Sequence, residues 1–384
     1  MFHIANEKDI KAGKVTDVYF LRTLEILKAQ GINRRVVAEV GTKGFPEGWE
    51  WGVFAGAEEC VELFKGRPIN FNGLREGTVF HPYEPVLEIE GNYQDFVLLE
   101  TALLGFICQA SGIATAAARC RKVAGEKPVI SFGARRMHPA IAPMIERSAF
   151  IGGCDGVAVV KSAEFIGEEP SGTMPHALIL IMGDTVKATK AFNEVISERV
   201  PRVSLIDTFH DEKFAALEVA EALGENLFAI RLDTPYSRRG NFLKIIEEVR
   251  WELNIRGFQH VKIFASGNID PQAIQNLNQS IDAYGVGTYI SNAPVIDFSM
   301  DIVEIEGVPL AKRGKLSGRK RLFRCPSCYT ARVLPRTNSD EVCDCGTSMD
   351  FLTIPIIKDG KVVIDLPTPQ KIRKYVLQQL LHYH

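Results

Sequence analysis

Two segments of this chain combine glycine with hydroxyl or amide residues directly after an apolar run, a pattern that could hold a phosphate. Ser266-Gly267-Asn268 follows one run, and Gly285-Val286-Gly287-Thr288 ends another. Closely spaced backbone N–H groups beside a hydroxyl can form a concave site for an anion. Both segments therefore predict contacts with a phosphate group.

Charged side chains follow neighbouring runs. Arg231 and Asp233 alternate along one run, so a strand would direct both to the same face. One could hold an anion while the other binds hydroxyls or a metal. Arg135 and Arg136 follow Phe132-Gly133, which places guanidinium groups near an aromatic ring and suits a carboxylate or a pyrophosphate. Together these residues describe a site for a phosphorylated sugar and a small planar acid, and no nucleophile–base pair is evident.

Seven short apolar runs between residues 115 and 290 are expected to position these side chains. Continuous apolar runs of this kind are typical of strands buried on both faces of a parallel sheet. Residues 210–223 and 241–253, between runs, have helical spacing. We therefore expect an α/β fold with a parallel β/α barrel over 115–290 and a site at the carboxyl ends of its strands. The runs lie within 128–136, 156–162, 177–185, 202–208, 227–234, 261–270 and 283–288.

Four cysteines near the C-terminus have a spacing close to that of a structural zinc ribbon. They form two pairs, Cys325 with Cys328 and Cys343 with Cys345. Four thiolates suit tetrahedral Zn²⁺, although C-x-x-C is more usual than C-x-C for the second pair. Such a closed site leaves no position for substrate, so the metal would stabilise the tail and would not catalyse. Free thiols or a disulfide loop are the alternatives.

The basic run KRGKLSGRKRLFR, residues 312–324, lies just before these cysteines. A zinc ribbon behind a basic run could bind nucleic acid. The whole chain has a net charge of −2, however, and the run has few aromatic residues for base stacking. We favour a solvated loop or a contact with an acidic substrate or a neighbouring subunit. A nucleic-acid-binding protein is the non-enzyme alternative.

Length and composition agree with a cytoplasmic enzyme. A chain of 384 residues is long enough for two or three domains. Its first residues have no apolar signal segment, and no run approaches 18 consecutive apolar residues, so neither secretion nor a membrane span is expected. Four cysteines in apolar surroundings are expected to be buried, reduced thiols, namely Cys60, Cys108, Cys120 and Cys154.

The first 114 residues differ from the barrel segment. Residues 38–56 and 75–91 are rich in β-forming and turn residues, whereas 95–125 is strongly helical. Asp17 is expected at the N-cap of a helix that ends near Gly31. We expect an α+β domain over 1–114, completed by part of 290–320. The barrel over 115–290 would follow, with a small zinc-ribbon-like domain over 310–384.

Several motifs, in order along nearly the whole chain, resemble those of the nicotinate phosphoribosyltransferases and their nicotinamide and quinolinate relatives. Thr16-Asp17-x-Tyr19 is similar to the N-terminal motif, FGARR (132–136) to the base-pocket motif, and SGTMPH (171–176) to G-T-x-x-H. Further matches are EGTVFHPYEPVLEIEG (76–91), LLETALL (98–104), Asp207-Thr208, Arg231 and Asp233, Ser266-Gly267, 285–288 and GKLSGRK (314–320), the last a shortened K-x-S-x-P-G-x-K.

The resemblance implies an irregular α/β barrel completed by a discontinuous N-terminal domain. It also implies transfer of phosphoribose from phosphoribosyl pyrophosphate to nicotinate, giving nicotinate mononucleotide and pyrophosphate. Arg135 would hold the nicotinate carboxylate and Phe132 one face of the ring. Tyr19 from the second subunit of a homodimer, or of a larger homo-oligomer, would cover the other face. Mg²⁺ would neutralise the leaving pyrophosphate, and ATP would phosphorylate His176.

The resemblance further implies a catalytic set and a larger substrate-binding set. Arg231 and Asp233 would contact the ribose 5-phosphate and its hydroxyls, with both glycine segments around the phosphate. The catalytic set is His176, Asp207 and Asp233. The substrate-binding set is Asp17, Tyr19, Phe132, Arg135, Arg136, Asp155, Thr208, Arg231, Ser266, Gly267, Gly285, Gly287 and Thr288.

Two relatives remain alternatives. Asp155 lies near the position where the nicotinamide branch uses an acid to accept a hydrogen bond from the amide, so nicotinamide stays open as the base. RRMHPA (135–140) resembles the basic segment of quinolinate phosphoribosyltransferase. That enzyme must neutralise two ring carboxylates, would be expected to carry more basic residues, and lacks a zinc tail.

Overall fold

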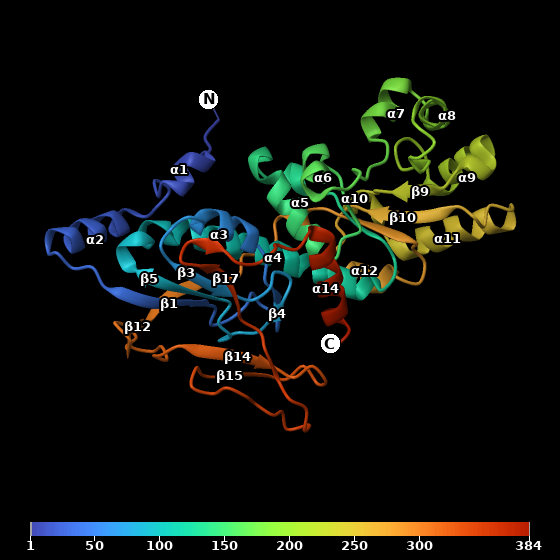
Figure 1. Ribbon diagram of the computed structural model, residues 1–384. Helices are drawn as coiled ribbons and strands as arrows, with labels where there is room; N and C mark the ends of the chain where they lie inside the picture. Colours follow the sequence, from blue (N-terminus) through green and yellow to red (C-terminus); the bar gives the residue numbers. More distant parts are fainter. Residues whose placement is uncertain (1, 384) are drawn as a thin grey trace. The chain divides into compact units, whose positions relative to one another are not determined.

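The computed structural model describes residues 2–383, apart from the side chain of Tyr236. The chain forms two compact units (Figure 1). The first joins residues 1–115 to 294–384, and the second comprises residues 116–293. The sequence predicts a separate C-terminal domain over 310–384. The structure instead places that segment in the same unit as the N-terminal residues.

A seven-stranded antiparallel sheet organises the first unit, in the order β13-β12-β1-β5-β3-β17-β18. Its middle strands are β12 (Ser299–Ile305), β1 (Arg35–Gly41), β5 (Leu87–Asn92) and β3 (Asn70–Gly73). β17 (Ile354–Lys358) pairs with β3, and β13 (Val308–Pro309) and β18 (Lys361–Val362) form the edges. The C-terminal segment thus belongs to the first unit because it supplies two strands of this sheet.

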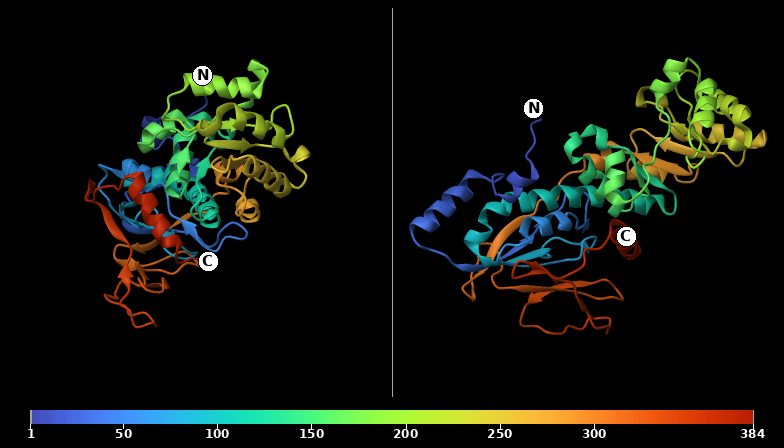
Figure 2. Two further views of the ribbon diagram at one scale, coloured as in Figure 1. Left: turned by 90° about the vertical axis from the view of Figure 1, so that its right-hand side faces the viewer. Right: turned by 45° about the horizontal axis from the view of Figure 1, so that its top comes forward.

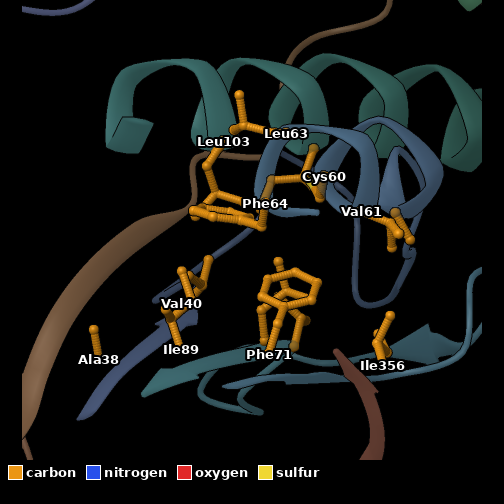
Figure 3. Close-up of a cluster of buried hydrophobic side chains, with 14 of the residues drawn as sticks. Ala38, Val40, Cys60, Val61, Leu63, Phe64, Phe71, Ile89, Leu103 and Ile356 are labelled. Carbon is orange, nitrogen blue, oxygen red and sulfur yellow. The ribbon is translucent and has the colours of Figure 1, made fainter. Parts of the chain in front are cut away.

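Apolar side chains fill the space between this sheet and two helices, α3 (Ala57–Phe64) and α4 (Glu100–Ala124) (Figure 3). Phe64 of α3 meets Phe71 of β3, with ring centroids 5.4 Å apart. Along β5 burial alternates with a period of two, so Leu87 and Ile89 enter this core. The intervening glutamates, Glu88 and Glu90, point to the opposite face.

Acidic side chains of the sheet form ion pairs with the basic run that precedes the cysteines. Arg319 pairs with Glu88 and Glu90, and Lys320 pairs with Glu39 at 2.7 Å. These pairs link β14 (Lys320–Arg324) to the sheet. In the right-hand view of Figure 2, the orange segment that contains β14 lies beside this sheet. Most of the basic run is neutralised within its own unit, which disfavours nucleic-acid binding. The remaining pairs are Lys312 and Lys315 with Asp301, and Arg324 with Glu84.

The first unit also contains smaller elements. β14 lies between β15 (Ala331–Pro335) and β16 (Asp350–Phe351) in a three-stranded sheet. Helix α2 (Val18–Ala29) begins after Asp17, which is at the predicted N-cap position. The Asp17 carboxylate accepts a hydrogen bond from Thr101 Oγ1 and not from the helix. The other elements are α1 (Glu7–Lys11), β2 (Gly52–Val53), β4 (Val79–Phe80), η1 (Tyr93–Asp95), η2 (Val97–Leu99) and α14 (Pro369–Leu380).

Six parallel strands form the sheet of the second unit, in the order β7-β6-β11-β10-β9-β8. This is the neighbour order of a barrel that is open between β7 and β8. The predicted α/β fold with a parallel barrel is therefore confirmed, with the barrel incomplete. The strands are β6 (Val129–Ser131), β7 (Gly156–Val157), β8 (Val203–Leu205), β9 (Ala229–Leu232), β10 (Lys262–Ser266) and β11 (Ala283–Val286).

The strand predicted within residues 177–185 is wrong, because these residues form helix α7 (His176–Met182). Pro175 is its N-cap, and Gly183, with a φ of 77°, ends it. Only one side of the helix is buried: Ile179 is enclosed, whereas Leu180 and Ile181 are 57% and 85% exposed. A short apolar run does not distinguish a strand from a helix by its pattern. The missing strand corresponds to the open side of the barrel.

Helices connect the strands of the second unit. The two predicted helices are confirmed as α9 (Glu212–Leu223) and α11 (Phe242–Ile255), and α9 contacts both α8 (Thr185–Val195) and α11. The remaining connections contain η3 (Ala134–Arg136), η4 (Pro139–Ile141), α5 (Ala142–Ile151), α6 (Val160–Ile166), η5 (Gly224–Asn226), α10 (Tyr236–Arg239), α12 (Pro271–Leu277) and α13 (Thr288–Ser291).

One helical stretch within residues 2–383, Val97–Ala124, is long and apolar enough to cross a membrane by length and composition. The structure uses it as a core element, with 56% of its most apolar window buried. Its polar side chains bond neighbouring backbone: Thr115 Oγ1 accepts from Val53 N–H at 2.8 Å, and Ser111 Oγ accepts from Ala55 N–H at 3.0 Å.

Two glycines of α4 test how closely this helix packs. A Cβ at Gly112 would collide with the carbonyl oxygen of Pro294, whereas a Cβ at Gly105 would meet no atom within 4 Å. We expect Gly112→Ala to lower the free energy of unfolding by about 1–3 kcal/mol through overpacking. Gly105→Ala should raise it by roughly 0.5–1 kcal/mol, since alanine favours a helix. Urea unfolding of both variants measures the difference, and equal effects would contradict the close packing at Gly112.

Candidate active site

The carboxyl ends of the parallel strands carry most of the predicted site residues. Phe132 follows β6, Asp207 and Thr208 follow β8, and Asp233 follows β9. Because all six strands run in the same direction, these ends lie at one edge of the sheet. Ser266 and Gly267 at the end of β10, and Gly285, Gly287 and Thr288 at the end of β11, lie at the same edge.

His176 is the residue around which the polar side chains gather. It is the first residue of α7, and its Nδ1 lies 3.1 Å from Thr208 Oγ1. Its Nε2 lies 3.9 Å from a carboxylate oxygen of Asp207 and 3.9 Å from one of Asp233. The imidazole is 39% exposed, so it faces both the two carboxylates and the solvent. The predicted catalytic set is thus brought together by α7, β8 and β9.

Asp207 is an almost fully buried carboxylate, with a side chain 1% exposed. Neither of its oxygens has a hydrogen-bond partner among the described side chains of residues 2–383. Burial raises the pKa of the Asp207 carboxyl above its ordinary value, and the nearby His176 opposes this rise. A buried polar group without a partner is unusual and suggests a site that is completed by a ligand.

Arg231 lies on the face of the sheet that also carries Phe132. In register it stands opposite Phe264 of β10, and its guanidinium carbon lies 5.9 Å from the centre of the Phe132 ring. Burial lowers the pKa of Arg231, which Asp233 and Asp207 counteract. Its Nη2 donates weakly to the Met174 carbonyl at 3.5 Å, and its buried Nε has no partner among the described residues. The guanidinium is therefore placed to bind an anion.

Two of the predicted glycines are required by close packing. A Cβ at Gly285 would lie 2.5 Å from the Phe132 ring, so glycine allows that ring to rest on β11. At Gly267, φ is +77°, and a Cβ would lie 2.7 Å from an Asp233 carboxylate oxygen. Gly287 precedes the short helix that Thr288 begins. The Ser266 hydroxyl has a long hydrogen bond to the Leu232 carbonyl, at 3.4 Å.

The predicted base-binding arginines follow Phe132 directly. Arg135 and Arg136 lie in η3 and are both exposed. Arg135 is close enough to Arg231 to lower the pKa of that guanidinium further. Arg135, Arg136 and Arg231 thus supply positive charge near Phe132, as a carboxylate or pyrophosphate ligand requires.

Asp155 does not belong to this group. It precedes β7, and its carboxylate accepts hydrogen bonds from Arg121 at 2.5 Å and from the N–H of Val129 at 2.8 Å. Val129 is the first residue of β6, so Asp155 lies at the amino edge of the sheet, opposite to the edge that carries Phe132. Its predicted place among the substrate-binding residues is corrected: Asp155 stabilises the start of two strands.

Asp17 and Tyr19 belong to the first unit. Tyr19 is exposed on the first turn of α2. Sequence reasoning assigned no role to Glu100 beside them, whose pKa burial raises to about 7, with the Asp301 and Asp17 charges adding to the effect. Glu100, Tyr93, Asp301 and Lys312 line a cavity of about 260 Å³. The sequence signal was the E-T pair at the start of a long helix.

The four predicted zinc ligands converge. The sulfur atoms of Cys325, Cys328, Cys343 and Cys345 all lie within 4.8 Å of one another. The N–H of Cys328 points to the Cys325 sulfur at 3.5 Å, and a left-handed Gly346, with a φ of 84°, closes the second turn. Four sulfurs at these distances fit one tetrahedral soft metal ion.

Removing the charge of two aspartates in the second unit, Asp207 and Asp155, should change the stability of the protein in opposite directions. Because folding raises the pKa of Asp207, ionisation of this carboxyl opposes folding. The stability lost through this ionisation is absent when the pH is below the ordinary pKa of an aspartate, and it is complete when the pH is above the raised pKa of Asp207 in the folded protein. Asp207→Asn should therefore raise the unfolding temperature at pH 8, and the gain should disappear towards pH 4.

Asp155→Asn is the matched control, because it removes the negative charge that pairs with the buried Arg121 guanidinium. It should lower stability by about 1–3 kcal/mol. Thermal unfolding of both variants between pH 4 and pH 8 provides the comparison. An Asp207→Asn variant less stable than the original protein at pH 8 would refute the assigned cost of this carboxylate.

Two family models match consecutive segments of the chain. Residues 17–111 match the family model described as the quinolinate phosphoribosyl transferase N-terminal domain, and residues 113–301 match that of its C-terminal domain. A nicotinate phosphoribosyltransferase of Mycobacterium tuberculosis is 29% identical over 401 residues, covering 92% of this chain and 87% of its own. The nicotinate phosphoribosyltransferase of Bacillus subtilis is 29% identical over 338 residues, covering 78% of this chain and 68% of its own.

Solved structures agree with these sequence matches. The crystal structure of nicotinate-nucleotide pyrophosphorylase from Pyrococcus furiosus is 57% identical and superposes with a TM-score of 0.98, covering 100% of this chain and 98% of its own. Human nicotinic acid phosphoribosyltransferase, 20% identical, shares the fold with a TM-score of 0.77, covering 96% of this chain and 94% of its own. The chain therefore belongs to the nicotinate and quinolinate phosphoribosyltransferase superfamily and is an enzyme of the phosphoribosyltransferase class.

Proposed function

We propose that this enzyme transfers phosphoribose from phosphoribosyl pyrophosphate to nicotinate, forming nicotinate mononucleotide and pyrophosphate for NAD biosynthesis. The observation that carries the proposal is the grouping of His176, Asp207, Asp233 and Arg231 beside Phe132 at one edge of the sheet. The names of the sequence relatives support nicotinate as the base.

The reaction breaks the bond between ribose C1 and pyrophosphate and joins C1 to the pyridine nitrogen. In this proposal Phe132 stacks on the pyridine ring, and Arg135 binds its carboxylate. Arg231 and the turns at Gly267 and Gly287 bind the 5-phosphate, while Asp233 holds the ribose hydroxyls. The unpartnered Asp207 carboxylate supplies negative charge near the positively charged ribosyl centre of the transition state.

Mg²⁺ and ATP are proposed as further ligands. Carboxylate oxygens are the donors that Mg²⁺ prefers, and those of Asp207 lack partners among the described residues. When bound, Mg²⁺ would neutralise charge on pyrophosphate. We also propose that His176 accepts a phosphoryl group from ATP, because its imidazole is 39% exposed at the polar edge and Thr208 contacts Nδ1.

We further propose a homodimer, or a larger homo-oligomer, with shared active sites and a location in the cytoplasm. Asp17 and Tyr19 would then contribute to the base pocket of the partner subunit. The exposure of Tyr19 and of Val18, Leu21 and Ile26 on α2 supports a subunit contact there. Closed two-fold contacts are the commonest arrangement of soluble homo-oligomers.

Quinolinate is the second candidate base. The descriptions of the two matching family models favour it. Quinolinate carries two carboxylates and would engage Arg136 or Arg231 in addition to Arg135. Nicotinamide is less favoured, because Asp155, which motivated it, lies at the other edge of the sheet.

The choice of base is tested with purified enzyme, phosphoribosyl pyrophosphate and Mg²⁺, offered nicotinate, nicotinamide or quinolinate with and without ATP. We expect nicotinate to be preferred and ATP to stimulate its turnover. Arg135→Ala should lower kcat/KM for nicotinate about 100-fold, equivalent to roughly 2.7 kcal/mol, since one charge-assisted hydrogen bond is lost.

Arg199→Ala is the control for Arg135→Ala, because Arg199 is an exposed arginine near the amino edge of the sheet. Its kinetics should equal those of the original enzyme. Release of carbon dioxide with rapid turnover of quinolinate would select the second candidate. Wild-type kinetics of Arg135→Ala would remove this residue from the base pocket.

We also propose that the four-cysteine cluster binds structural Zn²⁺. Thiolate ligation contributes folding free energy locally, so Cys343→Ser should lower the zinc content and expose residues 320–350 to protease. Cys108→Ser, outside the cluster, should leave the zinc content unchanged. Transfer activity should survive at least partly in both variants. Elemental analysis of the purified protein and limited proteolysis measure these effects; protein purified without any metal would argue against the site.

A further inference from the structure

Arg239 is a buried guanidinium beside the proposed phosphate site, and the assignments above give it no role. It ends α10 and is 9% exposed. Its Nε donates to the Thr234 carbonyl at 3.1 Å, and its Nη2 donates to the carbonyls of Ser266 at 3.1 Å and Gly267 at 2.7 Å. One side chain thus joins the loop after β9 to the turn after β10.

The carbonyl contacts fix the direction of two N–H groups. A trans peptide is planar, so its C=O and the N–H of the next residue point in opposite directions. When Arg239 holds the Ser266 carbonyl, the N–H of Gly267 points away from the guanidinium. When Arg239 holds the Gly267 carbonyl, the N–H of Asn268 likewise points away from the guanidinium. Among the described side chains and backbone, these two N–H groups have no hydrogen-bond partner.

The turn itself is left-handed. Gly267 and Asn268 are consecutive residues with positive φ, 77° and 48°. A Cβ on Gly267 would lie 2.7 Å from an Asp233 oxygen and 3.2 Å from Arg239 Nη2, so the glycine backbone separates a carboxylate from a guanidinium. Two adjacent N–H groups presented by such a turn bind phosphate oxygens.

We propose that Arg239 is a positioning residue that fixes the Ser266–Asn268 turn so that its two free N–H groups bind the 5-phosphate of the ribosyl substrate. The inference rests on the proposed function, which places that phosphate at the turn. Arginine suits this role because its planar fork reaches three carbonyls in a fixed geometry. The Phe242 ring, 4.1 Å from the guanidinium carbon, holds the fork in place.

Arg239→Lys tests the proposal, because it keeps the charge and removes the fork. Arg202→Lys is the matched control, because Arg202 is 7% exposed and also donates to backbone carbonyls but precedes β8 at the amino edge. These carbonyls belong to Asn193, Ile196, Ser197 and Val200. Calorimetry measures the Kd of ribose 5-phosphate. Steady-state kinetics measure KM for phosphoribosyl pyrophosphate and for the base, kcat, and inhibition by pyrophosphate.

We expect Arg239→Lys to raise the Kd of ribose 5-phosphate and KM for phosphoribosyl pyrophosphate at least about tenfold. The KM for the base, inhibition by pyrophosphate and kcat should change less than about threefold. Phe242→Leu, a milder variant that keeps all three hydrogen bonds, should show the same selective effect at about twofold to fivefold. Arg202→Lys should lower the unfolding temperature without altering any of these constants.

Equal constants in Arg239→Lys and Arg202→Lys, or a loss spread evenly over all ligands, would overturn the proposal. If Arg239→Lys does not fold, an unchanged Kd of ribose 5-phosphate in Phe242→Leu overturns it instead. If the unsubstituted enzyme binds ribose 5-phosphate but transfers no phosphoribosyl group from phosphoribosyl pyrophosphate to any of the three bases, the proposed function alone is refuted. Original enzyme that fails to bind ribose 5-phosphate would refute the phosphate site and Arg239 with it.

Discussion

The common direction of the six strands in the second unit is the constraint on which the site depends. A parallel sheet delivers the carboxyl end of every strand to one edge, however far apart the strands lie in the chain. Phe132, Asp207 and Asp233 therefore meet, although each follows a different strand. The barrel is open between β7 and β8, and His176 enters the site from α7, which forms where a further strand is absent. A closed barrel would place a strand end at this position.

Buried charge gives this edge its chemistry. Asp207 and Arg231 both have buried polar atoms without partners among the described residues. Burial raises the pKa of Asp207 and lowers the pKa of Arg231, so it disfavours the charged form of each. Such groups cost stability, and the cost is offset when a substrate supplies the missing partner. The imidazole Nε2 of His176 lies 3.9 Å from a carboxylate oxygen of each aspartate, Asp207 and Asp233. The arrangement suits a reaction in which positive charge develops on a sugar and no covalent nucleophile is required.

The first unit relies on a different balance. Its large sheet has an apolar face covered by α3 and α4, and acidic side chains elsewhere on the sheet bind the basic run through ion pairs. The three-stranded sheet beyond has a small core of its own, centred on Phe323, Met349 and two of the cysteines. So small a core is a weak source of stability. A metal held by four thiolates would supply the remaining folding free energy.

The sequence by itself determined the elements whose signals are local. The N-cap at Asp17, the helices α9 and α11, six of the seven predicted strands and the grouping of four cysteines follow from capping residues, periodicity and spacing. The same-face placement of Arg231 and Asp233 follows from the two-residue period of a strand.

The tertiary structure alone decided what depends on long-range contacts. Residues 177–185 became a helix, because a short apolar run carries no periodicity that separates the two states. Asp155 was assigned to the substrate-binding residues, and only the tertiary structure shows that its carboxylate pairs with Arg121, which is distant in sequence. No local sequence pattern marks Arg239. Its guanidinium donates to carbonyls that follow β9 and β10, and only the pairing of these two strands brings the carbonyls within its reach.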